Sequence, residues 1–163
     1  MDLNKLTYRS ETKQSDLEGI EDVLASSGFF HPYEIKVAKE LLEYRLEDGE
    51  KSGIDFLIAE DNGKVIGYIS SSFNDCTIST HHLYWFAVHG DYRGKGVGSV
   101  LLARLEESIV AKGGKKIVLE TSGREIYNPT RAFYLKKGYK ETGMIPDYYA
   151  VGDPNITYVK DVG

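Results

Sequence analysis

The sequence predicts one domain of mixed α/β (α+β) class, on the basis of its length, its composition and its periodicity. The chain has 163 residues, a length at which one hydrophobic core forms without splitting into separate domains. Apolar residues make up 41% and charged residues 28% of it, which is typical of a folded soluble protein. Segments with the period of a strand alternate with segments with the period of a helix. We therefore expect residues 1–163 to fold as one domain.

The N-terminal part is predicted to form a short strand and two helices. Residues 6–11, LTYRSE, alternate like a strand. A helix then begins at Ser15, with Glu18 as the second member of a capping box. Pro32 suits the first turn of a second helix, which Gly49 ends.

The middle of the chain is predicted to form a hairpin and a further strand. Residues 55–60 and 65–73 have strand character, and Asn62 and Gly63 between them favour a tight turn. The apolar run at 82–89 predicts the next strand.

The C-terminal part is predicted to contain two helices and three strands. A helix begins at about Ser99 and continues to the turn KGGKK at 112–116. A second helix has Asn128 as its cap, Pro129 in its first turn and Gly138 just past its end. The expected strands are 116–122, 138–145 and 156–162.

Charge and composition exclude several classes of function. The formal net charge is −5, so we expect no affinity for nucleic acid or for an anionic membrane. The one cysteine, Cys76, excludes an internal disulfide and a CxxC metal site, and we expect no metal. Since no signal peptide is recognisable and no apolar run approaches the roughly 20 residues of a membrane span, the expected location is the cytoplasm.

A glycine-rich loop, VHGDYRGKGVGS at 88–99, connects a predicted strand to a predicted helix. Glycines at 94, 96 and 98 leave the backbone N–H groups uncovered, and the helix start adds the positive end of its dipole. Arg93 and Lys95 add positive charge. The loop therefore predicts a phosphate site, and the alternative is a tight turn that needs glycine only for its backbone angles.

Two known phosphate loops fit these residues poorly. The P-loop pattern GxxxxGK[ST] fails because a glycine follows Lys95 where a hydroxyl residue is required. A dinucleotide fingerprint GxGxxG would begin at Gly94, with Glu120 as the ribose-binding acid. Ser99 replaces its third glycine, and five residues separate Val88 from Gly94. A dinucleotide-dependent oxidoreductase is thus the less favoured alternative.

Two motifs together resemble the GNAT superfamily of N-acetyltransferases. RGKGVG at 93–98 matches the acetyl-CoA-binding pattern RxxGxG, and NPTRAFYLKKGY at 128–139 is close to NxxAxxFYxxxGF, with the alanine one place later and Tyr139 for the last Phe. The resemblance implies a central mixed, mostly antiparallel sheet flanked by about four helices. It also implies transfer of an acetyl group from acetyl-CoA to a primary amine by direct attack in a ternary complex. A non-catalytic acyl-CoA-binding module on the same fold is the alternative.

The resemblance further implies which residues would hold CoA. The N–H groups from Arg93 to Ser99 would bind the pyrophosphate, and the backbone of Phe86 and Val88 would pair with the pantetheine arm. Asn128 matches an asparagine that contacts pantetheine, although a helix cap is its alternative role. The expected CoA contacts, in which the cations Arg131 and Lys137 would reach phosphates, are Phe86, Ala87, Val88, Arg93, Gly94, Lys95, Gly96, Val97, Gly98, Ser99, Asn128, Arg131, Tyr134 and Lys137.

Acetyl transfer to an amine needs a base, because an amine with a pKa near 10.4 is neutral in only about one molecule in a thousand at neutral pH. The resemblance indicates Glu120 as the first candidate and His82 as the second. For each, the alternative is a solvated surface side chain.

The same reaction needs a proton for the leaving thiolate and a donor to the oxyanion. Tyr134 matches the tyrosine that lies beside the sulfur in the family, where its hydroxyl would protonate the thiolate or donate a hydrogen bond to it. Its alternative role is a core aromatic. The N–H of Val88 would stabilise the oxyanion.

The acceptor side is expected in two aromatic and mildly acidic segments. The residues that would line it are Phe29, Phe30, His31, Tyr148 and Tyr149, with Asp147 or Asp153 attracting a cationic amine. The alternative is an apolar cover over helix ends or a homodimer surface. The sequence leaves open whether the acceptor is a protein, a polyamine, an amino acid or a drug.

Overall fold

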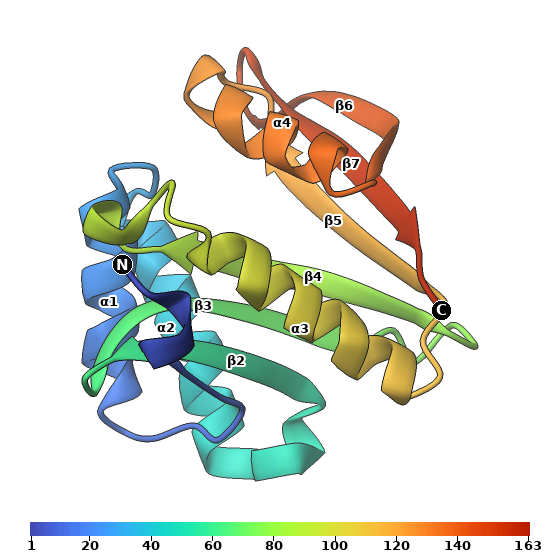
Figure 1. Cartoon of the computed structure of the whole chain (residues 1–163). Helices are drawn as coiled ribbons and strands as arrows, with labels where there is room; N and C mark the ends of the chain where they lie inside the picture. The colour runs from blue at the N-terminus through green and yellow to red at the C-terminus, as the bar shows by residue number, and fades with distance from the viewer. The chain divides into compact units, whose positions relative to one another are not determined.

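The computed structural model describes residues 1–163 and contains four α-helices and a mixed, mostly antiparallel sheet of seven strands in the order β1-β2-β3-β4-β5-β7-β6 (Figure 1). The predicted fold class is therefore confirmed. The strands are β1 (Thr7–Arg9), β2 (Ile54–Asp61), β3 (Lys64–Phe73), β4 (Thr80–Val88), β5 (Lys116–Ser122), β6 (Lys140–Ala150) and β7 (Asp153–Asp161). The helices are α1 (Asp16–Ser27), α2 (Pro32–Asp48), α3 (Val97–Ala111) and α4 (Asn128–Lys136), with short 3-10 turns η1 (Leu3–Lys5), η2 (Gly49–Ser52), η3 (Gly90–Tyr92) and η4 (Glu125–Tyr127).

The chain forms two compact units, which are described one at a time. Unit 1 comprises residues 1–72 and 85–108, and unit 2 comprises residues 73–84 and 109–163. That residues 1–163 fold as a single domain stays a prediction. None of the helices combines the length and the apolar composition that a membrane span requires.

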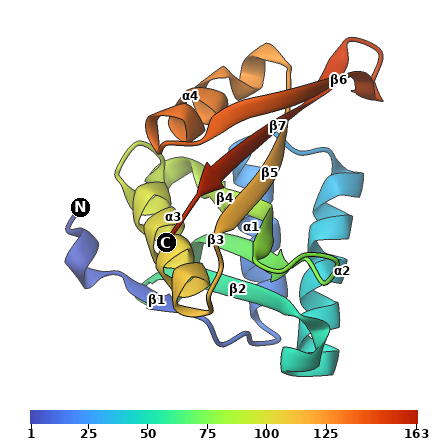
Figure 2. The ribbon, with the colours of Figure 1, turned by 90° about the vertical axis from the view of Figure 1, so that its right-hand side faces the viewer.

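Unit 1 is organised around the β2–β3 hairpin. Asn62 and Gly63 have φ values of 49° and 83°, the left-handed conformation that a two-residue turn requires, so the predicted hairpin is confirmed. Helices α1 and α2 cover one face of the hairpin and α3 covers the other (Figure 2). The core under α1 and α2 consists mainly of Ile20, Val23, Leu24, Ala38, Leu42, Phe56, Ile58 and Tyr68.

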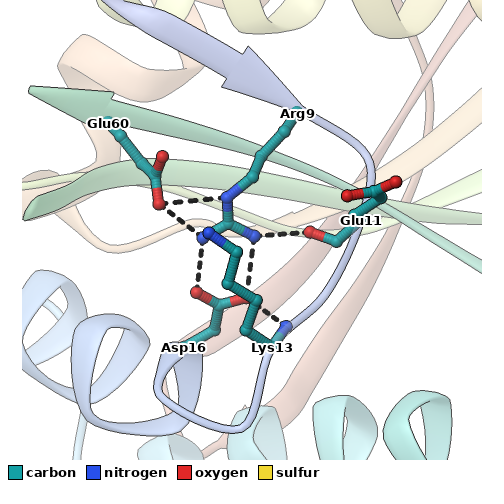
Figure 3. A network of polar contacts seen from close by, with 5 residues as sticks. All are labelled: Arg9, Glu11, Lys13, Asp16 and Glu60. Carbon is teal, nitrogen blue, oxygen red and sulfur yellow. Dashed lines mark hydrogen bonds and ion pairs between the residues drawn. The ribbon is translucent and has the colours of Figure 1, made fainter. Parts of the chain in front are cut away.

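A buried ion network connects β1, α1 and β2 within unit 1 (Figure 3). The Arg9 guanidinium donates to both carboxylate oxygens of Asp16, at 2.9 and 2.6 Å, and to Oε1 of Glu60 at 2.6 Å. Asp16 also accepts the N–H of Lys13 at 2.7 Å, whereas Ser15, the predicted cap, makes no capping bond with its side chain. Helix α1 follows Ser15 directly, as predicted, but the expected capping bond is absent because the backbone of Ser15 is already helical, with φ −64° and ψ −16°, instead of extended. The bonds to Asp16 raise the pKa of Arg9, so the guanidinium stays charged.

The helix starts in unit 1 follow their sequence signals with one exception. Helix α2 begins at Pro32 as expected, and the N–H of His31 donates to Oε2 of Glu34 at 2.6 Å. Helix α3 begins at Val97, two residues before the predicted start at Ser99. The earlier start buries the side chain of Val97, which is 1% exposed.

Unit 2 combines β5, β7 and β6 with α4 (Figure 2). The parallel register of β4 with β5 runs from Thr80↔Lys116 to His82↔Val118. Gly138 follows α4 with a φ of 89°, as predicted. Asn128 is the first residue of α4 rather than its cap; that prediction was wrong because the side-chain oxygen of Asn128 instead accepts a hydrogen bond from Arg131.

The last two strands differ from the predicted ranges. Strand β6 extends to Ala150 instead of ending near residue 145, and β7 begins at Asp153 instead of residue 156. All residues of β6 are exposed. A strand with no buried face needs no alternation of apolar and polar residues, which is the signal that predicts a strand from sequence. The β6–β7 register is also irregular between Ile145 and Ala150.

Candidate functional site

In unit 1 the glycine loop presents a row of backbone N–H groups. Gly94 and Gly96 have φ values of 68° and 91°, which non-glycine residues rarely adopt. The N–H groups of Gly94, Lys95 and Gly96 donate to no acceptor in the chain, and the first turn of α3 adds N–H groups that by helix geometry have no intrahelical partner. Successive free donors at a helix N-terminus suit a phosphate group.

The two cations of this loop are held in different ways. The Arg93 guanidinium lies over the ring of Phe29, 4.1 Å from its centroid, and has no ion-pair partner. Partial burial lowers the pKa of Arg93, but a guanidinium remains charged at neutral pH. Lys95 donates through Nζ to the backbone oxygen of Asp91 at 2.7 Å. The side-chain donors of Arg93 are therefore uncommitted, whereas Lys95 already uses one of the three donors of its ammonium group.

The third glycine lies where the start of α3 packs on β4. A Cβ at Gly98 would lie 3.4 Å from the ring of Phe86 and 3.7 Å from Cγ2 of Val88, which are ordinary van der Waals distances. The glycines that the loop conformation requires are therefore Gly94 and Gly96, with their positive φ values.

The end of β4 presents backbone groups away from β3. The N–H of His89 donates to the oxygen of Ile66 on β3 at 2.8 Å, and backbone groups of a strand alternate in direction. The N–H and C=O groups of Phe86 and Val88 therefore point to the other edge of β4. Ala87, also predicted to contact CoA, instead has its backbone oxygen toward Gly67 of β3 and its side chain in the core.

In unit 2 the predicted acid, Tyr134, is a buried residue of α4. Its ring lies 5.6 Å from that of Tyr139 and 6.3 Å from that of Tyr158, measured between centroids. Burial raises the pKa of the Tyr134 hydroxyl well above its usual value of 10. The hydroxyl therefore keeps its proton throughout the physiological range and acts as a hydrogen-bond donor.

The other α4 residues predicted to contact CoA are occupied by contacts within unit 2. Arg131 donates to the backbone oxygens of Ser122 at 2.6 Å and Arg124 at 3.1 Å, and also to Oδ1 of Asn128. Its guanidinium therefore fixes the segment between β5 and α4. Lys137 lies over the ring of Phe133, with Nζ 5.6 Å from the centroid.

The two candidate bases lie on one face of the sheet in unit 2. His82 is opposite Val118 in the β4–β5 register, and Glu120 is two residues further on, so all three side chains share a face. The carboxylate of Glu120 is exposed and accepts no hydrogen bond within the chain. The ring of His82 stacks on that of Tyr84.

A hydrogen-bonded chain of side chains accompanies Glu120 on this face. Thr157, directly opposite Glu120 in the β5–β7 register, donates to Oδ1 of Asn155 at 3.2 Å. Asn155 donates through Nδ2 to the hydroxyl of Tyr149 at 3.3 Å. Burial, and then the charge of Glu120, raise the pKa of Tyr149 to about 12. Sequence reasoning missed Asn155, because only the irregular β6–β7 register brings it to Tyr149.

Tyr134 and Glu120 lie on opposite faces of the β5–β7 pair. The ring of Tyr134 contacts Tyr158, which is opposite Leu119 in the register, while Glu120 is opposite Thr157. Successive residues of a strand face opposite ways. The Tyr134 hydroxyl and the Glu120 carboxylate therefore do not hydrogen-bond to each other, and each can act on a different group of the reactants.

The residues predicted for the acceptor belong partly to unit 1 and partly to unit 2. In unit 1, Phe29 lies against Arg93, Phe30 packs on Trp85 with centroids 5.6 Å apart, and the ring of His31 stacks on Tyr33. In unit 2, the rings of Tyr148 and Tyr149 form an edge-to-face pair with centroids 4.8 Å apart.

The two acids proposed to attract the amine are engaged within unit 2. Asp147 accepts the N–H of Gly152 at 2.7 Å. Asp153 accepts the hydroxyl of Ser122 and forms an ion pair with Arg124 at 3.3 Å. Glu120 is thus the acid of the candidate site that lacks such a partner.

Known proteins resemble this chain in sequence and in fold. The sequence pattern of the acetyltransferase (GNAT) family matches residues 20–139. The chain is 33% identical to the uncharacterised N-acetyltransferase MJ1530 of Methanocaldococcus jannaschii over 106 residues, covering 64% of this chain and 65% of that protein. A crystal structure of a GNAT-family protein from Desulfovibrio desulfuricans is 32% identical, with a TM-score of 0.93 and coverage of 97% of this chain and 99% of that one.

The chain therefore belongs to the acetyltransferase (GNAT) family, and its curated relatives are acetyltransferases. The matched parts span 65%, 60% and 43% of the lengths of three of these relatives. The PaiA N-acetyltransferase of Thermoplasma acidophilum, solved in complex with coenzyme A, has the same fold, with a TM-score of 0.74 at 21% identity over 96% of this chain and 98% of that one.

Proposed function

We propose that this protein is an N-acetyltransferase that uses acetyl-CoA and transfers the acetyl group to a primary amine by direct attack in a ternary complex. The observation that carries the proposal is the row of free N–H groups at Gly94–Gly96, which continues into the first turn of α3. These donors suit the pyrophosphate of CoA. Membership in an acetyltransferase family supports the same donor.

The pantetheine arm is proposed to pair with the end of β4. The backbone groups of Phe86 and Val88 point away from β3, so they are oriented to receive an extended chain as a further strand would be received. The N–H of Val88 would then donate to the oxygen of the thioester as it becomes an oxyanion, an interaction worth a few kcal/mol when the donor is preorganised.

The base is proposed to be Glu120, with His82 as the second candidate. This role is supported by the exposed carboxylate of Glu120, which has no partner in the chain and is therefore available to a water or to the amine. The amine nitrogen bonds to the acetyl carbon as the C=O bond opens to the oxyanion, and the proton that the nitrogen loses passes to this carboxylate. The oxyanion then re-forms the C=O bond as the C–S bond breaks, and CoA leaves as its thiolate.

Tyr134 is proposed to stabilise the departing thiolate of CoA. Its raised pKa favours a hydrogen bond over complete proton transfer, because a thiol has a pKa near 8.5 and a phenol above 10 is the weaker acid. The side chain therefore lowers the energy of the thiolate until solvent supplies the proton.

The runner-up is a non-catalytic acyl-CoA-binding module. A dinucleotide-dependent oxidoreductase is disfavoured because η3 lies between the end of β4 and Gly94, whereas a dinucleotide turn follows its strand directly.

The test is release of free thiol from acetyl-CoA with a panel of amines: a peptide N-terminus, lysine, a polyamine, an amino acid and an aminoglycoside. The proposal predicts release above the amine-free rate with at least one acceptor, and thermal stabilisation by CoA but not by NAD. Stabilisation by CoA with no thiol release for any amine would favour the binding module. Absence of stabilisation by CoA would overturn both the acetyltransferase and the binding module.

A further inference from the structure

Helix α1 and the segment that follows it contact the glycine-rich loop at three points in unit 1. Nε2 of His89 lies 3.4 Å from Oδ2 of Asp22, and the N–H of Gly90 donates to Oγ of Ser26 at 3.0 Å. The third contact is that of Phe29 with Arg93. These contacts follow one side of α1 and its C-terminal extension, and they meet the loop at residues 89–93.

The third contact differs from the others because it involves a cation without a counter-ion. Arg93 forms no ion pair and no hydrogen bond through its side chain, and its guanidinium lies 4.1 Å from the centroid of the Phe29 ring. A ring face attracts a guanidinium and restricts its orientation, while the N–H groups at the edge of the plane remain available. A flexible side chain is thereby held in one geometry beside the free N–H groups of the loop.

We propose that Phe29 is a positioning residue that holds the Arg93 guanidinium ready for the phosphates of CoA, rather than part of the acceptor wall. Phe29 itself touches no phosphate in this account; it acts through Arg93. Preorganisation of the cation spares CoA part of the cost of ordering a long side chain on binding. The inference rests on the proposed function for the identity of the ligand.

The conformation of the segment after α1 supports this role. Gly28 has a φ of 72° and ends α1, and the N–H of Phe29 donates to Oγ of Ser27 at 3.3 Å. The direction of the chain at Phe29 is therefore set by α1, which is itself joined to the loop through Ser26. The ring is placed by a rigid element instead of a free loop.

The test is a double-mutant cycle with CoA binding measured by isothermal titration calorimetry, which requires no acceptor. Phe29→Leu keeps an apolar side chain but removes the ring, and we expect the dissociation constant of CoA to rise by about three- to tenfold. Phe29→Trp restores a ring face and should bind CoA within about twofold of the wild type. In the Arg93→Met background, Phe29→Leu should have no further effect, because the partner through which it acts is gone.

Tyr44→Leu is the matched control, since it removes an exposed ring of α2 in the same unit and should leave CoA binding unchanged. The inference is overturned if Phe29→Leu binds CoA like the wild type, or if its loss persists in the Arg93→Met background. If Phe29→Leu does not fold, a loss of CoA binding in a folded Phe29→Trp variant overturns it as well. Failure of the wild type to bind CoA overturns the proposed function, a result distinct from the others.

Discussion

The two regions that carry the proposed chemistry use different parts of their residues. In unit 1 the loop at Gly94–Ser99 presents backbone N–H groups, and every second residue of it is a glycine. In unit 2 the candidate groups are side chains, Glu120 on one face of β5–β7 and Tyr134 on the other. We infer that donor binding depends on backbone conformation, whereas turnover depends on individual functional groups. Substitutions in unit 1 should therefore change the affinity for CoA, and substitutions in unit 2 should change kcat.

The largest effect is expected in unit 2 for Glu120→Gln. Loss of the base should lower kcat/KM at pH 7 by about 100-fold, within the range that general bases contribute. The rate should partly recover toward pH 10, because the amine then loses its proton without help. Thiol release with the best amine of the panel measures this. If Glu120→Gln retains activity while His82→Gln loses it, the base is His82.

The next effect is expected for Tyr134→Phe, which removes one hydroxyl and keeps the ring. We expect kcat to fall by about 10- to 100-fold, with the KM for acetyl-CoA nearly unchanged. Because its pKa is raised above 10 by burial, Tyr134 stays protonated, so the loss should be the same at pH 6 and pH 9. Steady-state kinetics at both values check this, and turnover equal to the wild type would remove Tyr134 from the mechanism.

A smaller effect, on CoA binding instead of kcat, is expected in unit 1 for Gly96→Ala. Its φ of 91° disfavours any side chain, and the new Cβ would lie 3.1 Å from Cδ1 of Leu3. Strain of about 1–2 kcal/mol in the loop should weaken CoA binding by about tenfold and leave kcat at saturation nearly unchanged. Gly53→Ala is the matched control: its φ is 70°, with no atom within 4 Å of the new Cβ. It should lose stability but not CoA affinity, and equal affinity losses in both variants would contradict the account.

The smallest effect is expected for Val88→Ile. The proposed donor at this position is the backbone N–H, which the substitution keeps, so kcat should change by less than about twofold, far below the loss seen when an oxyanion donor is removed. The same kinetic assay checks this. A drop of tenfold or more in a variant with normal thermal stability would show that the side chain itself takes part.

Local signals allowed much of the fold to be predicted. The Asn62–Gly63 turn and the glycine after α4 are conformational properties of neighbouring residues, so they can be read from sequence. The Arg9–Glu60 contact could not be, because 51 positions separate the two residues. The cap assigned to Asn128 failed for a local reason, since Arg131 in the next turn of the same helix donates to its side-chain oxygen.

In the candidate site too, features of neighbouring residues could be predicted and contacts between distant residues could not. The glycine-rich loop is a property of consecutive residues, and its glycines already indicate uncovered N–H groups. The hydrogen bonds that join Thr157, Asn155 and Tyr149 depend on strand register and on an irregularity in the β6–β7 pairing, and neither can be predicted from the sequence. Likewise, nothing in the letters around Phe29 indicates that its ring lies under Arg93.

The central claim, that backbone N–H groups at Gly94–Ser99 bind the donor, is tested most directly by titrating the isotope-labelled protein with CoA in amide NMR. Hydrogen bonds to phosphate should move the amide protons of Gly94, Gly96 and Gly98 downfield as CoA saturates the protein, whereas NAD should leave them in place. Unchanged resonances at these three glycines in the presence of saturating CoA would contradict the account.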